Sequence, residues 1–486
     1  MWATALSVAF CVWYSALWTV FLLGLNTAKK RYSRLPTSDP PPPPVDPATC
    51  PGVSILRPLR GLDCNLYDNL EASFRQDYPR FELVLSVADE ADAAIPIVRE
   101  LQRRYPHVDS DLVIGHDSVG VNPKINNLIR PYRQAKYDLL WVLDSNVLTS
   151  PECLSRSVPL FSSSPSSPQD AQQHPIGLVH HVPFAVYPDA MLGSRVEQVY
   201  LCSTHAKMYL AINRVGVASC VTGKSCLYRK SDLERASELK RNRGRLPPAP
   251  PGVTSEPGLA AFGMYLGEDN EIGVALWEEL GMRHAMGIEV AGNAVGTMSF
   301  QKFFRRRVRW IRVRKYMVLA STLVEPLTES LLSGLLGALA FHHLFRLPSY
   351  LFLPLHLLAW YTLDAALYRA LLPASPATST AARPPAHDGP GASYLSAWAT
   401  RELLALPVWA FAMLGDTVSW RDEGHVYRVQ RDGSVRALRE GEREAWVERA
   451  WGTVVTRWEG KRGAAGYVTL SPDDVEGRAA GHSEVA

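Results

Sequence analysis

The N-terminal end of the chain is a long apolar segment. No charged residue occurs between Trp2 and Leu25, and a basic triplet follows at 29–31. A helix of about 20 apolar residues spans a bilayer, whereas the apolar core of a cleaved signal peptide has about 7–15 residues and follows a basic segment. We therefore expect residues 1–27 to be an uncleaved transmembrane anchor, with a cleaved signal as the alternative. Basic flanks favour the cytosolic side, so the chain after the anchor is expected in the cytosol.

Further apolar stretches occur near the C-terminus, at about 327–345, 350–372 and 394–414. The segment 301–325 before them is rich in arginine, which again indicates the cytosolic side. Residues 326–415 are therefore expected to form a C-terminal membrane region of two to three helices. The last stretch carries Arg401 and Glu402, and charges are costly in hydrocarbon. That stretch is expected to lie in the interface or to pack inside a bundle.

The region between the membrane segments has the pattern of an α/β domain. A Pro-rich linker at 28–50 is followed at 51–300 by apolar runs that alternate with helical periodicity. This alternation predicts a mixed, mostly parallel sheet with helices on both faces. Disordered insertions are expected near 162–175 and 237–259, and the tail at 416–486 is polar, with no recognisable motif. The expected strands are 53–56, 81–87, 112–114, 139–143, 176–182, 217–222 and 286–290.

Two aspartates follow expected strands. Asp92 comes shortly after the strand at 81–87, and Asp144 comes directly after the strand at 139–143. Ligands of such sheets bind beyond the carboxyl ends of the strands, and carboxylates suit the Mg²⁺ or Mn²⁺ that accompanies a nucleotide diphosphate. Each aspartate alone is more typical of a turn or a helix cap than of a ligand site.

A second pair of carboxylates, Glu268 and Asp269, opens a helical pattern. Acidic residues at a helix start are favoured by the helix dipole, which is the structural explanation. The functional explanation is a general base that takes a proton from an alcohol. Lys124 lies in another expected helix start, Asn122–Asn127, where an anion could bind or Asn could simply cap the helix.

An arginine-rich motif with a tryptophan, at 306–310, lies just before the membrane region. Arginine offers a planar fork of donors that suits phosphate, and tryptophan offers a flat face for a sugar or a lipid. The alternative is a basic patch that binds anionic lipid, and both explanations can hold together.

Charge and cysteine usage exclude other classes. A net charge of +3 over 486 residues is too small to indicate a nucleic-acid-binding protein. The seven cysteines form no Cys-x-x-Cys pair, which argues against a disulfide framework and a zinc site and fits a reducing compartment.

Taken in order, Asp92, Asp144, Asp269 and the 306–310 motif match the D, D, D, (Q/R)xxRW signature of GT-A, family-2-like glycosyltransferases. Within that group the chain resembles the ceramide glucosyltransferases, or glucosylceramide synthases, of fungal type. The segments that carry this closer resemblance are 53–61, 122–128, 179–181, 197–200 and 220–227.

The resemblance implies an inverting transfer of glucose from UDP-glucose to the primary hydroxyl of ceramide, on the cytosolic face of Golgi or ER membranes. It implies that Asp269 is the catalytic base. A divalent cation would bind at Asp144, with Asn146 or water completing the shell because the second aspartate of a DxD motif is missing. His205 matches a histidine near the active site. Donor-binding residues would be Arg57, Pro58, Asp92, Lys124, Asn127 and Asp144, and Arg306, Arg309 and Trp310 would contact the diphosphate, sugar and acceptor.

Other readings remain open from the sequence. A processive polysaccharide synthase needs a pore, usually with more membrane helices, and a dolichyl-phosphate sugar transferase would take a phosphate acceptor. A membrane scaffold or transporter subunit with a nucleotide-binding domain is the non-enzymatic alternative.

Overall fold

A computed structural model describes residues 1–33, 49–162, 174–249, 252–253, 256–375, 392–419, 426–438 and 442. All of these except Glu442 belong to one unit, Met1–Leu438, and Arg439–Ala486 form a second unit. Most of the expected linker at 28–50, most of the insertion at 162–175 and most of the tail at 416–486 lie outside the described residues.

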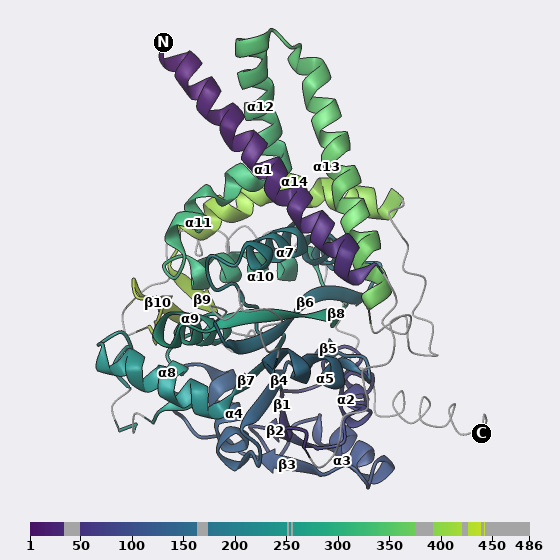
Figure 1. Ribbon diagram of the computed structural model, residues 1–486, viewed down its shortest axis with the longest axis vertical. Helices are drawn as coiled ribbons and strands as arrows, with labels where there is room; N and C mark the ends of the chain where they lie inside the picture. Colours follow the sequence, from purple (N-terminus) through teal and green to yellow (C-terminus); the bar gives the residue numbers. More distant parts are fainter. Residues whose placement is uncertain are drawn as a thin grey trace, which may run out of the picture. The chain divides into compact units, whose positions relative to one another are not determined.

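The central layer is an eight-stranded mixed sheet with the strand order β3-β2-β1-β4-β7-β6-β8-β5 (Figure 1). β1 to β4 pair in parallel, as do β6 and β8, whereas β7 and β5 run antiparallel to their neighbours. The sheet is therefore mixed and mostly parallel, which confirms the expected fold class. The strands are β1 (Val53–Leu59), β2 (Phe81–Val87), β3 (Ser110–Ile114), β4 (Leu139–Leu143), β5 (Val147–Leu148), β6 (Ile176–Pro188), β7 (Ser225–Arg229) and β8 (Arg283–Gly296).

Helices cover both faces of the sheet because successive strand residues point to opposite sides. On one face Ile55 and Trp141 pack with apolar residues of α2, α3 and the short helix α5. On the other face Leu56 and Val142 pack with α4, α8 and α9. These helices are α2 (Leu66–Phe74), α3 (Ile95–Arg104), α4 (Pro123–Gln134), α5 (Cys153–Ser157), α8 (Lys230–Asn242) and α9 (Glu268–Leu280).

Two expectations for this region were wrong. Residues 217–222 do not form a strand, because the pairing partner of β4 begins only at Ser225, after the turn at Gly223. The start of the insertion expected near 237–259 is ordered, since α8 continues to Asn242 and Ser237 is fully buried beneath the loop. The Ser237 hydroxyl accepts a hydrogen bond from the Gly258 amide at 2.7 Å, which closes that loop.

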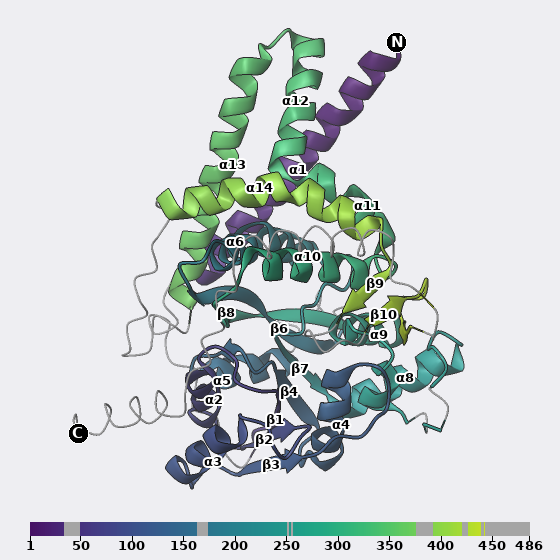
Figure 2. The same cartoon turned by 180° about the vertical axis from the view of Figure 1, so that it is seen from behind.

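Long apolar helices gather at one end of the unit. α1, α12 and α13 project together away from the sheet, with α1 crossing the other two (Figures 1 and 2). α1 and the helix Ser349–Ala374 are long and apolar enough to cross a membrane, and the bent pair Leu319–Thr328 and Ser330–Phe345 is a third candidate if it counts as one span. The helices are α1 (Trp2–Tyr32), α11 (Leu319–Val324), the 3₁₀ turn η6 (Glu325–Thr328), α12 (Ser330–Phe345) and α13 (Ser349–Leu371).

The last apolar stretch behaves differently. α14 (Ala392–Met413) lies across the base of the projecting helices rather than alongside them (Figure 2). Its two charged residues, Arg401 and Glu402, are 3% and 5% exposed and face inward. The helix therefore buries its charges against the protein, in line with the expectation that it is not a simple span.

A buried ion pair joins the helices beside the sheet to the candidate membrane helices. Lys207 of α7 lies 2.7 Å from Asp364 of α13, and both side chains are fully buried. The Lys207 ammonium also lies 4.1 Å from the ring centre of Phe21 in α1. α1 approaches α7 so closely at Gly24 that a Cβ there would come within 2.5 Å of the Lys207 carbonyl oxygen. α7 (Ala206–Val215) follows α6 (Leu192–Tyr200) and the π-helix η4 (Leu201–His205) in the chain. These three helices form one apolar cluster with α1, α13 and α14.

A small sheet lies beyond α14, in the segment where no motif was recognised. β9 (Thr417–Ser419), β10 (Val426–Val429) and β11 (Val435–Ala437) form an antiparallel three-stranded sheet. Arg312 of α10 (Phe300–Arg314) holds this region in place by donating to the carbonyls of Phe411 at 3.0 Å and Thr417 at 2.8 Å. One arginine of the basic segment is therefore structural.

Candidate active site

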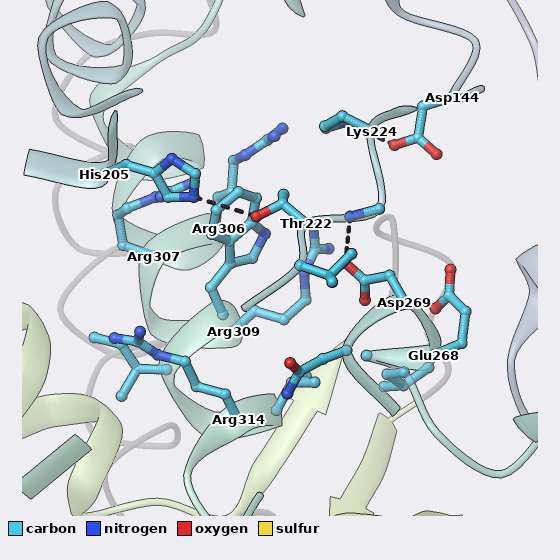
Figure 3. A pocket seen from close by; sticks show the side chains of 18 of the residues that line it. Asp144, His205, Thr222, Lys224, Glu268, Asp269, Arg306, Arg307, Arg309 and Arg314 are labelled. Atoms are coloured by element: carbon cyan, nitrogen blue, oxygen red, sulfur yellow. Dashed lines mark hydrogen bonds and ion pairs between the residues drawn. The ribbon is translucent and has the colours of Figure 1, made fainter. Parts of the chain in front are cut away.

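A cavity of about 1490 Å³ lies where β1 and β4 end and β7 begins. Figure 3 shows the side chains of α10 and of the β7 and α9 starts turned toward one another in it. Arg57 is the one expected site residue that does not line it. The expected residues that do are Pro58, Asp92, Lys124, Asn127, Asp144, His205, Asp269, Arg306, Arg309 and Trp310.

Asp144 stands at the carboxyl end of β4, where the fully buried strand emerges at the cavity. Its two carboxylate oxygens lie 2.8 Å from the ammonium groups of Lys124 and Lys224 respectively. Burial alone would raise the pKa of Asp144, but the two lysines outweigh burial and hold it well below its usual range. The Asp144 carboxylate is therefore ionised at any physiological pH.

Lys124 links two helix starts. Asn122 caps α4 by accepting a hydrogen bond from the Lys124 amide at 2.9 Å, and its own amide group donates to Glu268 at 2.8 Å. The Lys124 ammonium then reaches Glu268 at 3.0 Å as well as Asp144. One cation thus lies between carboxylates from β4 and α9, which are far apart in the sequence.

Asp269 lies in the first turn of α9, as expected, with its carboxylate in the cavity. It accepts a hydrogen bond from the Gly223 amide, which orients the side chain. Burial, together with the neighbouring charge of Glu268, raises the pKa of Asp269 to about 6, with Lys124 acting in the opposite direction. A carboxylate whose pKa approaches neutrality is suited to accept a proton.

Gly223 must be small for this arrangement. A Cβ on Gly223 would come within 2.7 Å of the Asp269 Cβ and within 2.9 Å of its Oδ2. The segment 222–224 therefore brings a backbone donor to Asp269 and the ammonium of Lys224 to Asp144.

The arginine-tryptophan motif occupies α10, opposite Asp269. Arg306 and Arg307 both lie 3.1 Å from Glu197 of α6, which anchors this end of the motif. The Arg307 guanidinium lies 4.0 Å from the ring centre of Trp310, and that of Arg306 lies 5.3 Å from it. Cations therefore stack around the tryptophan at the wall of the cavity.

His205 is the last residue of the π-helix η4, and π-helical turns are frequent at functional sites. Its ring stacks on Tyr209, with ring centres 5.4 Å apart, and meets Trp310 edge-on at 6.1 Å. Burial, with Arg307 and Arg314 nearby, lowers the pKa of His205 to about 3. The imidazole is therefore neutral, and within the described residues its Nδ1 atom has no hydrogen-bond partner.

The remaining expected residues shape the wall. The carboxylate of Asp92 accepts hydrogen bonds from the amides of Gly61 at 3.0 Å and Ala94 at 2.8 Å. Asn127 donates to the carbonyl of Leu59 at 3.0 Å, which ties α4 to the end of β1. Both side chains are thus oriented by backbone groups near strand ends.

Arg57 is fully buried and turns away from the cavity. It donates to the carbonyls of Asp144 at 3.0 Å, Ser145 at 3.1 Å and Val147 at 3.0 Å. Its effect on the site is therefore exerted through the backbone of the turn that carries Asp144.

Sequence reasoning did not assign roles to several residues that the fold brings into this site. Lys224 lies in a segment that carried only the family resemblance, and Glu268 was considered only as part of a carboxylate pair that could supply a general base. Their contacts with Asp144 and Lys124 could not be derived from spacing. Arg307 and Arg314 belong to the recognised basic segment, so the local signal was charge alone. Glu197 lies in the segment 197–200 that carries part of the family resemblance, but a glutamate inside an amphipathic helix is usually solvated, so its pairing with the arginines was not predicted.

The cavity offers some, but not all, of the oxygen ligands that a hard divalent cation needs. Magnesium is commonly held by one or two carboxylates together with water and substrate phosphates. Asp144 provides one ionised carboxylate at the cavity, and Asn146 provides an amide oxygen 3.1 Å from Lys224. The described residues contain no group of three or more His, Cys, Asp or Glu side chains placed for a metal. A cation there would complete its shell with water and a diphosphate.

Comparison of the chain with known proteins finds a matching family and several similar proteins that share one name. The sequence pattern of the family described as Glycosyl transferase family 21 matches residues 11–240 and 254–435. The ceramide glucosyltransferase of Komagataella phaffii is 37% identical, covering 89% of this chain and 92% of that protein. The ceramide glucosyltransferase of Candida albicans is 32% identical, covering 78% and 87%. Among solved structures, a mannosyltransferase from Pyrobaculum calidifontis in complex with GDP-Man and Mn²⁺ aligns over 76% of this chain and 98% of that chain, with 17% identity and a TM-score of 0.40.

Proposed function

This chain belongs to glycosyl transferase family 21, and we propose that it transfers glucose from UDP-glucose to the primary hydroxyl of ceramide. The products are β-glucosylceramide and UDP, with inversion at the anomeric carbon. Relatives named ceramide glucosyltransferase, 30–37% identical to this chain over most of its length, support this substrate pair. The observation that carries the chemistry is the convergence of Asp269 with the arginines of α10 in one cavity that also reaches membrane helices.

The proposed reaction is a single displacement. Asp269 accepts the proton of the primary hydroxyl as its oxygen bonds to the anomeric carbon, while the bond from that carbon to the UDP oxygen breaks. The raised pKa of Asp269 supports a base role, because a stronger base accepts the proton more readily. Inversion follows from attack on the face opposite the leaving group.

Negative charge grows on the departing diphosphate and must be offset. The guanidinium groups of Arg306 and Arg309 are proposed for this task, since both line the cavity on the α10 side. Trp310 is proposed to pack against the sugar or the acceptor, and neutral His205 beside it adds no further charge. Asp92, Lys124 and Asn127, together with Pro58, are proposed to border the nucleotide.

A divalent cation, Mg²⁺ or Mn²⁺, is proposed to bind at Asp144 together with the diphosphate of the donor. When bound, it supplies Lewis-acid stabilisation of the leaving diphosphate. Because both Asp144 oxygens lie against lysine ammonium groups, cation binding requires at least one lysine to move aside. UDP binding measured by calorimetry with and without Mn²⁺, in wild type and Asp144→Asn, tests this site without turnover.

Attachment to a membrane is supported by the two candidate spanning helices. We propose a multi-pass arrangement in the Golgi or the ER, with residues 51–300 as a cytosolic catalytic domain and 301–325 at the interface. The basic flanks at 29–31 and 305–315 support the cytosolic side. Protease protection in sealed microsomes tests this orientation.

The decisive experiment is incubation of membranes containing the full chain with UDP-glucose and short-chain ceramide, followed by determination of the anomeric linkage. Asp269→Asn should abolish transfer and leave UDP-glucose binding largely intact, whereas the exposed Asp111→Asn should behave as wild type. A polymer, or a product on a lipid phosphate, would replace this proposal with one of the other transferase readings. Full activity in Asp269→Asn would remove Asp269 from the base role.

A further inference from the structure

The cavity extends beyond the reaction centre around Asp269 and α10. Past Arg314 it continues between α11, η6 and α14 and reaches Trp13 in the middle of α1. The Trp13 indole donates to the Leu327 carbonyl at 3.1 Å, which joins α1 to η6 at this end. Because α1 is a candidate membrane span, the far end of the cavity lies beside membrane helices. Ligand pockets usually have about 300–1,000 Å³, so this cavity has room for a second ligand.

Apolar side chains form about half of the walls of this membrane-side part, which we call the acceptor arm. Val324 of α11 lines it from one side, and Leu404, Ala405 and Val408 of α14 line it from the other. Leu403, the neighbour of Leu404 in the sequence, lies on the outer face of α14, where its side chain is 64% exposed. α14 thus presents one face to the arm and another to its surroundings.

Two acid–base pairs interrupt the apolar wall. Arg314 pairs with Glu325 where the arm joins the reaction centre, and Arg314 is one of the charges that depress the His205 pKa. Deeper in the arm Arg401 lies 3.0 Å from Glu329. These four charged side chains all line the cavity, as do the hydroxyl-bearing residues Ser321 and Thr328, so a ligand in the arm would meet both charged and hydroxyl groups.

A second carboxylate, that of Glu402, joins the deeper pair. Arg401 also pairs with Glu402 and donates to the Thr204 hydroxyl, so one guanidinium serves two carboxylates. Glu329 is 8% exposed, and its Oε2 atom is the one that lies 3.0 Å from the Arg401 guanidinium, yet within the described residues this atom accepts no hydrogen bond of good geometry. A buried carboxylate oxygen in this state favours a ligand that donates a hydrogen bond and disfavours an anion.

We propose that the acceptor arm binds the lipid acceptor, with Glu329 accepting a hydrogen bond from its uncharged amide or hydroxyl head and the α14 side chains packing on its hydrocarbon. The inference rests on the proposed transfer to ceramide and deepens it. A neutral lipid head satisfies Glu329, whereas a lipid phosphate in the same place would be repelled by the Glu329 and Glu402 carboxylates. The arm therefore selects against phosphorylated acceptors by charge.

Adjacent leucines on α14 provide a matched test in the full-length enzyme. Leu404→Trp fills the arm, and Leu403→Trp adds the same bulk to the outer face. We expect Leu404→Trp to raise the KM for short-chain ceramide about tenfold with the KM for UDP-glucose nearly unchanged, and Leu403→Trp to match wild type. Equal ceramide KM values in the two variants, or parallel changes in both substrates, would overturn the proposal.

A charge-specific test uses Glu329→Gln, which keeps the shape of the side chain. Ceramide 1-phosphate should inhibit this variant several-fold more strongly than wild type, because one of the two repelling carboxylates is gone. Equal inhibition would overturn the role of Glu329. A photoactivatable ceramide, used without donor, should label peptides of η6 and α14 in wild type and lose that labelling in Leu404→Trp.

The two proposals fail differently. If wild type makes no glucosylceramide, the proposed function fails. If wild type makes glucosylceramide while the photoactivatable ceramide labels other segments, only the acceptor arm fails.

Discussion

The pH dependence of transfer tests the chemical assignment of Asp269 most directly. A general base must be ionised to accept a proton, so the rate should rise with pH through the pKa of Asp269, about 6. With that pKa, about a tenth of the carboxylate is ionised at pH 5, whereas an ordinary aspartate would be almost fully ionised there. The rate at pH 5 should therefore be about a tenth of the plateau reached above pH 7.

The substitution Glu268→Gln separates the two causes of the raised Asp269 pKa, which are burial and the charge of Glu268. Burial is the main reason for the raised pKa of Asp269, and the charge of Glu268 is the second. Removing that charge should lower the pKa, and it also frees Lys124 from one of its two carboxylate partners. The acid midpoint should then move down by on the order of half to one pH unit, which is about 1 kcal/mol of interaction between the two carboxylates.

The assay is the initial rate of glucosylceramide formation between pH 4.5 and 8, each variant being scaled to its own plateau. Scaling removes any change in maximal rate that the substitution causes. Glu278→Gln, on the same helix but 58% exposed, is the matched control and should keep the wild-type midpoint. A wild-type midpoint near 4, or the same midpoint in Glu268→Gln and wild type, would refute the assignment.

Three further substitutions have expected outcomes. Gly223→Ala should lower kcat by about 10²-fold and also lower the unfolding temperature, because the added Cβ clashes with the Asp269 Cβ and displaces its carboxylate; a normal kcat would show that this contact is not required. Arg57→Met leaves buried carbonyls of the turn after β4 without donors and should cost about 3 kcal/mol of stability, seen as a lower unfolding temperature, with wild-type stability as the contrary result. Lys207→Met should cost about 3–5 kcal/mol because Asp364 stays buried and unpaired, and Lys207→Met with Asp364→Leu should regain most of it; no recovery in the double variant would contradict the pairing.

Local sequence patterns predicted the elements of the fold well where a short-range cause determines them. The N-terminal apolar helix, the strands β1, β2 and β4, and the helix that begins at Glu268 all follow from hydropathy, period and helix-start chemistry. Asp144 and Asp269 could be selected because a strand end and a helix start are recognisable from neighbouring residues. The sequence left the placement of α14 open. Its charged residues Arg401 and Glu402 were compatible both with a helix in the membrane interface and with a helix packed inside a bundle.

Long-range contacts decided the rest. The apolar run at 217–222 looks like a strand in isolation, yet the register with β4 begins at Ser225 and leaves Gly223 free to contact Asp269. Arg57 belongs to a motif at a strand end, which suggests ligand contact, but the β1 register turns it toward carbonyls 87–90 residues away. Neither outcome has a signal within one element.

Short-range physics acts on neighbours in the chain, so one sequence can specify which segments are apolar, which begin helices and which end in carboxylates. The order of strands in a sheet depends on the free energy of the whole assembly, and that order brings Lys224 to Asp144 and Lys124 to Glu268 across 80 and 144 residues of chain. The same is true of Glu329 and Arg401, which meet only because α14 lies across the base of the projecting helices α12 and α13. The sequence therefore identified the carboxylates and basic groups of the site, whereas their pairing, burial and pKa values depend on the tertiary structure.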